Sequence, residues 1–462
     1  MYYFCKRRYT VFTILILYPI LVLPQSKVYS LNELVDSAMH YLPLFKQKQA
    51  VVNSYQSSVI DVRHSYLPQL KINDQVNVGT DNSIAGAYLP LGVNPSVSAG
   101  VRDANIYQPA SGNIAVLHSE YELADFGQKN AAINYAEANV RAEEADLQRL
   151  LYEAKIEIAR LYFNLLKQEY RLNTDSENIN RYQNIYSVIK ALALSGIRPG
   201  SDTSLSRAEL SKAIITYNQT LGGVNSLRQQ IAYWCGIDAT RIQADTSALH
   251  SSQDYGAAIN VPIDTIHHPF IDFYVKQEQV LLSNEKLISR SYLPKVLLAA
   301  SSWARGSSIQ YDDQFKSVST GFGYQRFNYM AGIAVTYDLF NGIHKRDKLA
   351  TSHFQTLASD YALHQEELTL NNASLQADRA LETAANNLKE MPIQLQSAKD
   401  VYGQKIAQYK AGLINLIDLT NASFVLYRSQ IDYIETFSDW YLAMLDKASA
   451  TGTLDSFIQS IK

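Results

Sequence analysis

Helical and extended patterns alternate in a fixed order along this chain. Apolar residues recur at helical spacing over residues 30–65 and again over residues 267–291, which predicts an amphipathic helix in each stretch. Both stretches end in the tetrapeptide Ser-Tyr-Leu-Pro, and proline disfavours helix in the residue before it. We therefore predict that the chain passes from helix to strand at Pro68 and at Pro294.

Two extended stretches follow each proline and predict two β-hairpins, over residues 68–123 and 294–340. In the last stretch the odd-numbered residues from Ala331 to Leu339 are apolar, and the even-numbered ones are small or polar. This alternation is typical of a half-buried soluble strand and equally of a strand with one lipid face and one lumen face. Each stretch has about the 9 to 11 residues that a tilted strand needs to cross a bilayer. The four stretches are residues 68–78, 112–123, 294–304 and 329–340.

A very long helical pattern follows each hairpin. These two segments contain almost no helix breakers apart from Pro392. Because proline removes a backbone hydrogen bond inside a helix, we expect Pro392 to bend the second long helix. Some 68 residues of helix are on the order of 100 Å long, more than a compact soluble domain needs. A turn with Gly196 or Gly412 then leads to an antiparallel return helix. The long helices are predicted over residues 127–194 and 342–409, and the return helices over residues 203–235 and 416–450.

This order of elements occurs twice, which indicates a duplicated unit. The two tetrapeptides are 226 positions apart, whereas Gly196 and Gly412 are 216 apart. The second copy has therefore lost ten residues between these landmarks. Self-similarity over so long a period is the signature of a repeat. We divide the chain into a first repeat, residues 27–250, and a second repeat, residues 251–462.

The first residues have the pattern of an export signal. Three basic residues precede an apolar stretch from Val11 to Leu23, which is too short to span a bilayer comfortably. We assign residues 1–26 to a signal peptide, with the mature chain beginning within residues 25–30. Beyond it no run of about eighteen apolar residues occurs. If the mature chain enters a membrane, we expect it to do so as strands.

Composition excludes several function classes. The 41 basic and 44 acidic residues give no basic excess, so nucleic acid is not an expected partner. Outside the signal the only cysteine is Cys235, whose apolar neighbours predict a buried and inert thiol. His267 and His268 have no ligand partners at suitable spacing and are expected to be solvated. We predict no metal, no cofactor and no enzymatic activity.

Four candidate membrane strands are too few to close a barrel within one chain, because closed membrane barrels begin at about eight strands. An open edge in lipid leaves backbone groups unpaired at several kcal/mol each. The chain must therefore assemble with copies of itself. Two copies would give eight strands around a lumen filled by side chains, whereas three would give twelve and leave room for a water-filled passage. The predicted fold class is mainly α with a transmembrane β-barrel portion, in which long antiparallel helices form an α-barrel.

The long helices start with the motifs Ala-Asp-Phe-Gly at 124–127 and Leu-Phe-Asn-Gly at 339–342. With these motifs and the tandem order of hairpin, long helix and turn, the chain resembles the TolC-like family of outer-membrane efflux proteins. The resemblance covers essentially the whole mature chain. It implies a homotrimer with a twelve-stranded barrel in the outer membrane and a helical tunnel across the periplasm. It also implies two partners, a periplasmic adaptor protein and an inner-membrane pump that supplies the energy.

Asp202 and Asp418 each lie six residues after the turn glycine, Gly196 or Gly412. Their positions at helix starts explain both residues without a functional role. Ser201 or Asp202 would serve as an N-cap, and Asp418 would complement the helix dipole. The resemblance implies that Asp418 belongs to a carboxylate ring at the closed end of the tunnel. Asn421 stands where the family has a second acid, so the ring would be weaker here.

The resemblance further implies polar links that hold the gate closed. Asp202 and Tyr409 match one such link, and we expect a hydrogen bond between them. Ile414 stands where the family has an arginine, and Arg198 is a possible substitute. The implied function is a passive exit duct of a tripartite efflux or secretion system, with a cargo that the sequence does not identify. The alternative is a rigid helical surface or adhesion protein without a transport role.

Overall fold

The computed structural model describes residues 27–84, 100–244 and 267–461, and the chain divides into two compact units. The helical unit comprises Met1–Phe45, Leu151–Asp264 and Thr369–Lys462, and the sheet unit comprises Lys46–Leu150 and Thr265–Leu368. Each unit contains parts of both predicted repeats. The predicted signal peptide and the boundary between the repeats lie outside the described residues.

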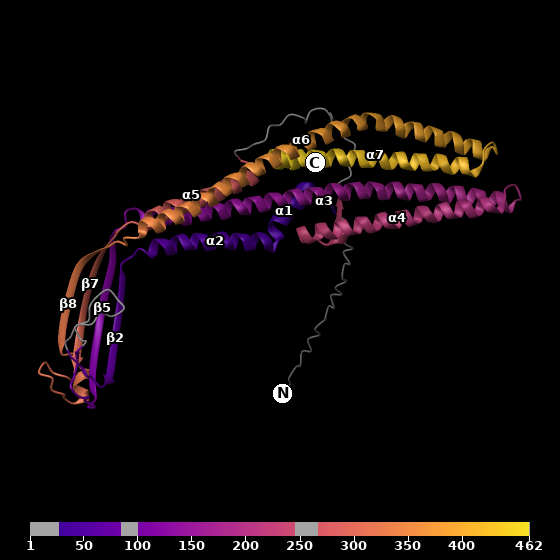
Figure 1. Ribbon diagram of the computed structural model, residues 1–462. Coiled ribbons are helices and arrows are strands. Elements are labelled where there is room, and N and C mark those ends of the chain that lie inside the picture. The colour runs from indigo at the N-terminus through magenta and orange to yellow at the C-terminus, as the bar shows by residue number, and fades with distance from the viewer. Residues whose placement is uncertain (1–26, 85–99, 245–266, 462) are drawn as a thin grey trace, which may run out of the picture. The chain divides into compact units, whose positions relative to one another are not determined.

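The sheet unit is built on four long strands, β2 (Gln69–Gly79), β5 (Ala110–Ala124), β7 (Lys295–Ser307) and β8 (Arg326–Thr336). They lie side by side in the order β2-β5-β7-β8, and every pair is antiparallel (Figure 1). Two shorter strands, β3 (Ser83–Ile84) and β4 (Gly100–Val101), pair with each other. Within the described chain β2 and β8 have one long neighbour each, so both far edges of the sheet are unpaired.

Helices α2 (Pro43–His64) and α5 (Pro269–Ser291) lead into the sheet, and Pro68 and Pro294 directly precede β2 and β7. The helical pattern predicted over residues 30–65 is confirmed, but it forms two helices. It is divided into α1 (Leu31–Tyr41) and α2, because Leu42 is extended before Pro43.

The expectation that His268 is solvated is wrong. Its side chain is fully buried and accepts a hydrogen bond from the backbone N–H of Phe270 at 3.2 Å. His268 is thus the N-cap of α5, with Pro269 as the first helical residue.

The last strand ends earlier than its alternating pattern predicts. β8 stops at Thr336, so Tyr337 and Leu339 lie outside it. The reason is Asp338, whose side chain accepts the N–H of Phe340 at 2.9 Å and whose carbonyl accepts the N–H of Asn341 at 3.1 Å. These local hydrogen bonds form the turn that begins α6 (Asn341–Lys410).

The strand register separates an apolar face from a polar face. Directly opposed residues share a face, and Leu70, Ser119, Ala300 and Ala331 are aligned across the four strands. The apolar face exposes large side chains on both outer strands: Leu70, Ile72, Val76 and Val78 on β2, and Phe327, Tyr329, Ile333 and Val335 on β8. The polar face carries Lys71, Gln75, His118, Glu120, Arg305 and Arg326.

The helical unit contains the later parts of α3 (Gln128–Leu194) and α6, together with α4 (Gly200–Cys235), α7 (Leu416–Thr451) and a short α8 (Leu454–Ser460). The long and return helices agree with their predicted ranges to within a few residues, and α6 continues through Pro392. A parallel pair of three-residue strands, β1 (Lys27–Tyr29) and β6 (Ile242–Ala244), was not predicted. None of the described helices is both long and apolar enough to cross a membrane.

Aromatic side chains fill the core where α3, α7 and α8 meet. The ring of Phe163 stacks on Tyr441 at 5.1 Å between centroids and lies 6.0 Å from Phe457. Cys235, at the end of α4, is buried as predicted and donates to the carbonyl of Leu34 at 3.3 Å. Burial raises the pKa of its thiol to about 12, so it remains protonated and unreactive.

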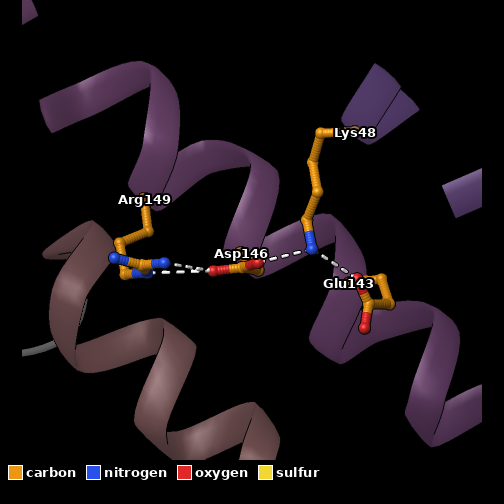
Figure 2. A network of polar contacts seen from close by, with 4 residues as sticks. All are labelled: Lys48, Glu143, Asp146 and Arg149. Carbon is orange, nitrogen blue, oxygen red and sulfur yellow. Dashed lines mark hydrogen bonds and ion pairs between the residues drawn. The ribbon is translucent and has the colours of Figure 1, made fainter. Parts of the chain in front are cut away.

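A charged network joins α2 to α3 in the sheet unit (Figure 2). Lys48 Nζ lies 2.6 Å from Glu143 Oε2 and 2.5 Å from Asp146 Oδ2. Arg149 donates to the other oxygen of Asp146 at 2.7 Å, and its guanidinium lies 4.8 Å from the ring centroid of Phe273 on α5. Burial opposes the charge on Lys48, but hydrogen bonds with Asp146 and Glu143 outweigh it and raise the pKa of Lys48. The network therefore stabilises the contact between the two helices.

Replacement of Lys48 should destabilise this contact. Lys48→Met leaves Glu143 without its cation and Asp146 with Arg149 alone. We therefore expect the free energy of unfolding to fall by about 1–3 kcal/mol. Thermal unfolding followed by circular dichroism measures the change. Lys46→Met is the matched control, because Lys46 is exposed on the same helix. Equal melting temperatures for the two variants would mean that the network contributes nothing.

Candidate functional site

The two turns that join the long helices to their return helices have the same backbone geometry. Gly196 and Gly412 have φ of +74° and +77°, a left-handed conformation that glycine adopts without strain. Ile197 donates its N–H to the carbonyl of Leu192 at 2.9 Å, and Leu413 donates to Gln408 at 2.9 Å. This bond from the residue after the glycine closes each helix end as a Schellman motif. The duplicated sequence thus folds into two equivalent tips.

The return helices begin differently in the two copies. Asn415 is the N-cap of α7, and its side chain accepts the N–H of Asp418 at 2.9 Å. The corresponding N-cap of α4 is Pro199, which has no side chain able to cap. The N-cap role expected for Asp202 is therefore wrong, since Asp202 lies within the first turn of α4. Both aspartates complement the dipole of their helix.

An apolar cluster packs the two tips against each other inside the helical unit. It takes side chains from α3, α4, α6 and α7, and several partly buried residues, including Ile414, pack around it. Ile414 stands where the family resemblance implies an arginine, and its apolar side chain suits this packing. The buried members are Tyr182, Ile185, Ile189, Leu210, Ala213, Tyr409, Leu416 and Leu419.

Arg198 links the first tip to the second. Its guanidinium lies 5.2 Å from the ring centroid of Tyr409 and donates to the carbonyl of Ile414 at 3.4 Å. The hydrogen bond expected between Asp202 and Tyr409 is not formed, because the buried hydroxyl of Tyr409 has no partner among the described residues. Burial raises the pKa of Tyr409, the charge of Arg198 lowers it and that of Asp202 raises it. Arg198 therefore acts on Tyr409 through its ring instead of its hydroxyl.

Asp418 and Asn421 are both exposed on α7, one turn apart, whereas Asp202 is half-buried. The corresponding aspartates of the two repeats thus have different surroundings. An exposed carboxylate is free to act on ions in solution. Large apolar side chains are exposed beside it, with Leu413 at 75% and Ile417 at 58%.

A buried carboxylate that the sequence did not reveal joins three helices of the same unit. Asp175 on α3 is 1% exposed. It accepts hydrogen bonds of 2.6 Å from Thr220 on α4 and of 2.6 Å from Tyr427 on α7. Each of its oxygens is used, so the group is satisfied. Its partners are 45 and 252 positions away, and no local pattern marks such a contact.

Nothing in residues 27–84, 100–244 and 267–461 forms a group of three or more His, Cys, Asp or Glu side chains that could hold a metal ion. The chemistry available at the tips is therefore that of an exposed carboxylate, a cation stacked on a phenol ring and an apolar cluster.

Residues 287–453 match the family model described as outer membrane efflux protein. This segment runs from the end of α5 past the end of α7. No curated protein sequence gives a match.

Solved structures share the fold over most of the chain. The outer membrane protein VceC of Vibrio cholerae superposes with a TM-score of 0.72 at 14% identity, covering 91% of this chain and 96% of VceC. The CmeC outer membrane channel of Campylobacter jejuni gives 0.70 at 14% identity, with 92% and 86% covered. The MtrE outer membrane channel of Neisseria gonorrhoeae, solved in its open state, gives 0.69 at 15% identity, with 92% and 89% covered. At these identities the likeness is one of fold.

Proposed function

We propose that this chain, a TolC-like outer-membrane efflux protein, is the passive exit duct through which a pump assembly releases its cargo across the outer membrane. The observation that carries the proposal is the four-stranded sheet with two unpaired edges. Its outer strands expose Ile72 at 80%, Tyr329 at 89% and Val335 at 69%, all on the apolar face. A soluble protein of this size rarely exposes so many large apolar side chains on one face.

Contact with lipid would account for the exposed apolar face, and pairing with neighbouring copies of the chain would account for the two unpaired edges. Unpaired backbone groups cost several kcal/mol each in hydrocarbon, so β2 of one copy would pair with β8 of the next. Three copies would then close a barrel of about twelve strands around water. The polar face, with Lys71, Glu120 and Arg305, would line that water. Such a duct needs no catalytic group and no cofactor, because the pump supplies the energy.

The two tips would form the periplasmic end of the duct and dock on an adaptor and an inner-membrane pump. Among the tip residues, Asp418 is exposed and carries a negative charge that three copies would bring to one level of the pore. Facing carboxylates attract cations and repel anions. Asn421 adds polarity without charge, so the ring holds a single carboxylate per subunit. A surface or adhesion role would leave the unpaired edges of the sheet unexplained.

Removal of the Asp418 charge should weaken cation preference. In planar bilayers with a KCl gradient, we expect Asp418→Asn to lower the ratio of potassium to chloride permeability by about twofold, because the nearest fixed charge to the passing ion is lost. The reversal potential measures the ratio.

Asp439→Asn is the matched control for Asp418→Asn. Asp439 is exposed on the same helix, about 30 Å away along its axis, and its loss should leave the reversal potential nearly unchanged. Failure of the unmodified protein to conduct ions at all would exclude the duct. Conduction with the same selectivity in Asp418→Asn would remove Asp418 from the pore.

Arg198 would act as a latch between the tips. Its stacking on Tyr409 and its hydrogen bond to the carbonyl of Ile414 bridge one helical hairpin to the other. An opening movement that separates the hairpins must break both contacts.

Loss of the Arg198 latch should favour the open channel. A cation–π contact near the surface is worth about 0.5–1 kcal/mol, so we expect Arg198→Ala to raise open probability about two- to fivefold in single-channel recordings. Lys190→Ala is the control, because Lys190 is an exposed cation near the same tip. An unchanged open probability in Arg198→Ala would show that the contact does not restrain the tips.

A further inference from the structure

Two arginines lie directly opposite each other at the far end of the sheet. Arg305 on β7 and Arg326 on β8 are paired in the strand register. Both side chains are exposed. Arg305 is ten residues beyond Lys295, the first residue of β7, so the pair lies at the end of the strands remote from α5.

The surrounding backbone fixes which face the pair occupies. The segment Val318–Phe322, a 3-10 helix, and the glycine after it pack against the apolar face at Gly306. A Cβ atom at Gly306 would lie 1.8 Å from the carbonyl oxygen of Gly323. Side chains alternate between faces along a strand, so Arg305 points to the opposite, polar face. Arg326 shares that face because it is directly opposed to Arg305.

Like charges directly opposed on two strands destabilise the pair. Neither guanidinium has an acidic partner among the described residues, and the contact found for Arg326 is donation to the carbonyl of Gln325 at 2.8 Å. The neighbours at the same level on β5 and β2 are Ile114 and Gln75, which are neutral.

The nearest acid on the polar face of the strands is too distant to neutralise the pair. Glu120 is level with Ala299, six residues from Arg305 and therefore about 20 Å away along the strand. That distance exceeds the Debye length of about 8 Å at physiological salt. Lys71 and His118 are also at the Glu120 end, since they are level with Ser301. The arginine pair is thus an isolated patch of positive charge.

We infer that Arg305 and Arg326 form a binding site for polyvalent anions in the barrel lumen near its outer mouth. The inference rests on the proposed duct, in which the polar face lines water and three copies bring three pairs to one level. Two adjacent guanidiniums present a fork geometry that suits phosphate and carboxylate groups. An anion between them removes the repulsion that the empty pair carries. The site would favour anionic cargo at the last step of release.

Block of the channel by inorganic tripolyphosphate tests the site. The anion is added to the side of a planar bilayer that the strand ends face, and the concentration that halves the current is measured. We expect Arg305→Gln/Arg326→Gln to require about tenfold more tripolyphosphate, because both fixed charges per subunit are lost. The substitutions remove a repulsion, so assembly should persist, and the trimer seen without heating in gel electrophoresis checks it.

Lys71→Gln/Lys295→Gln is the matched control. It removes the same charge from the polar face, but at the other end of the strands, and should leave block close to that of the unmodified protein. If tripolyphosphate blocks the arginine variant as strongly as the unmodified protein, or does not block a conducting unmodified channel, the site is overturned. The proposed duct is unaffected by either result. A protein that forms no channel overturns the duct and the site together.

Discussion

The two open edges of the sheet are the constraint on which the rest of the structure depends. β2 and β8 are each hydrogen-bonded to a long strand on one side only, and nothing described in the chain covers their outer edges. Both outer strands have every residue exposed, and their large apolar side chains share one face except for Met330. A single chain in water would leave both the edges and this face unsatisfied. In the proposed duct, sister chains and lipid would satisfy them at once, and a closed, water-filled cylinder would follow from that pairing.

The helical unit shows how a duplicated element can take two roles. Both tips end in the same glycine geometry, yet Asp202 is half-buried beside Arg198 and Tyr409, whereas Asp418 is exposed. The first copy supplies a contact that holds the hairpins together, and the second supplies a charge for solvent. Asp175, which binds Thr220 and Tyr427, ties the same helices from within. The corresponding aspartates of the two repeats therefore lie in different surroundings, although the turns before them fold alike.

Sequence patterns predicted the features that depend on local spacing. The long helices, the Ser-Tyr-Leu-Pro junctions and the burial of Cys235 follow from periodicity and composition. The errors came from single side chains whose local hydrogen bonds override the structure that the hydrophobic or polar pattern predicts. Asp338 ends β8 by binding nearby N–H groups, and His268 is buried because it caps α5.

Contacts between distant positions were the least predictable. The stacking of Arg198 on Tyr409 requires two turns that are 216 positions apart to pack together. The Arg305 and Arg326 pair requires the register of the second hairpin, which depends on where its strands begin and end. The sequence showed which residue types could act at the candidate sites. The packed structure showed which partners those residues contact.

Native mass spectrometry of the protein released from detergent tests the central claim most directly, because it counts chains in the assembled particle. The account predicts a particle of three chains that needs detergent to stay in solution. A single chain that remains soluble without detergent would contradict it, since its edges would then be stable without partners.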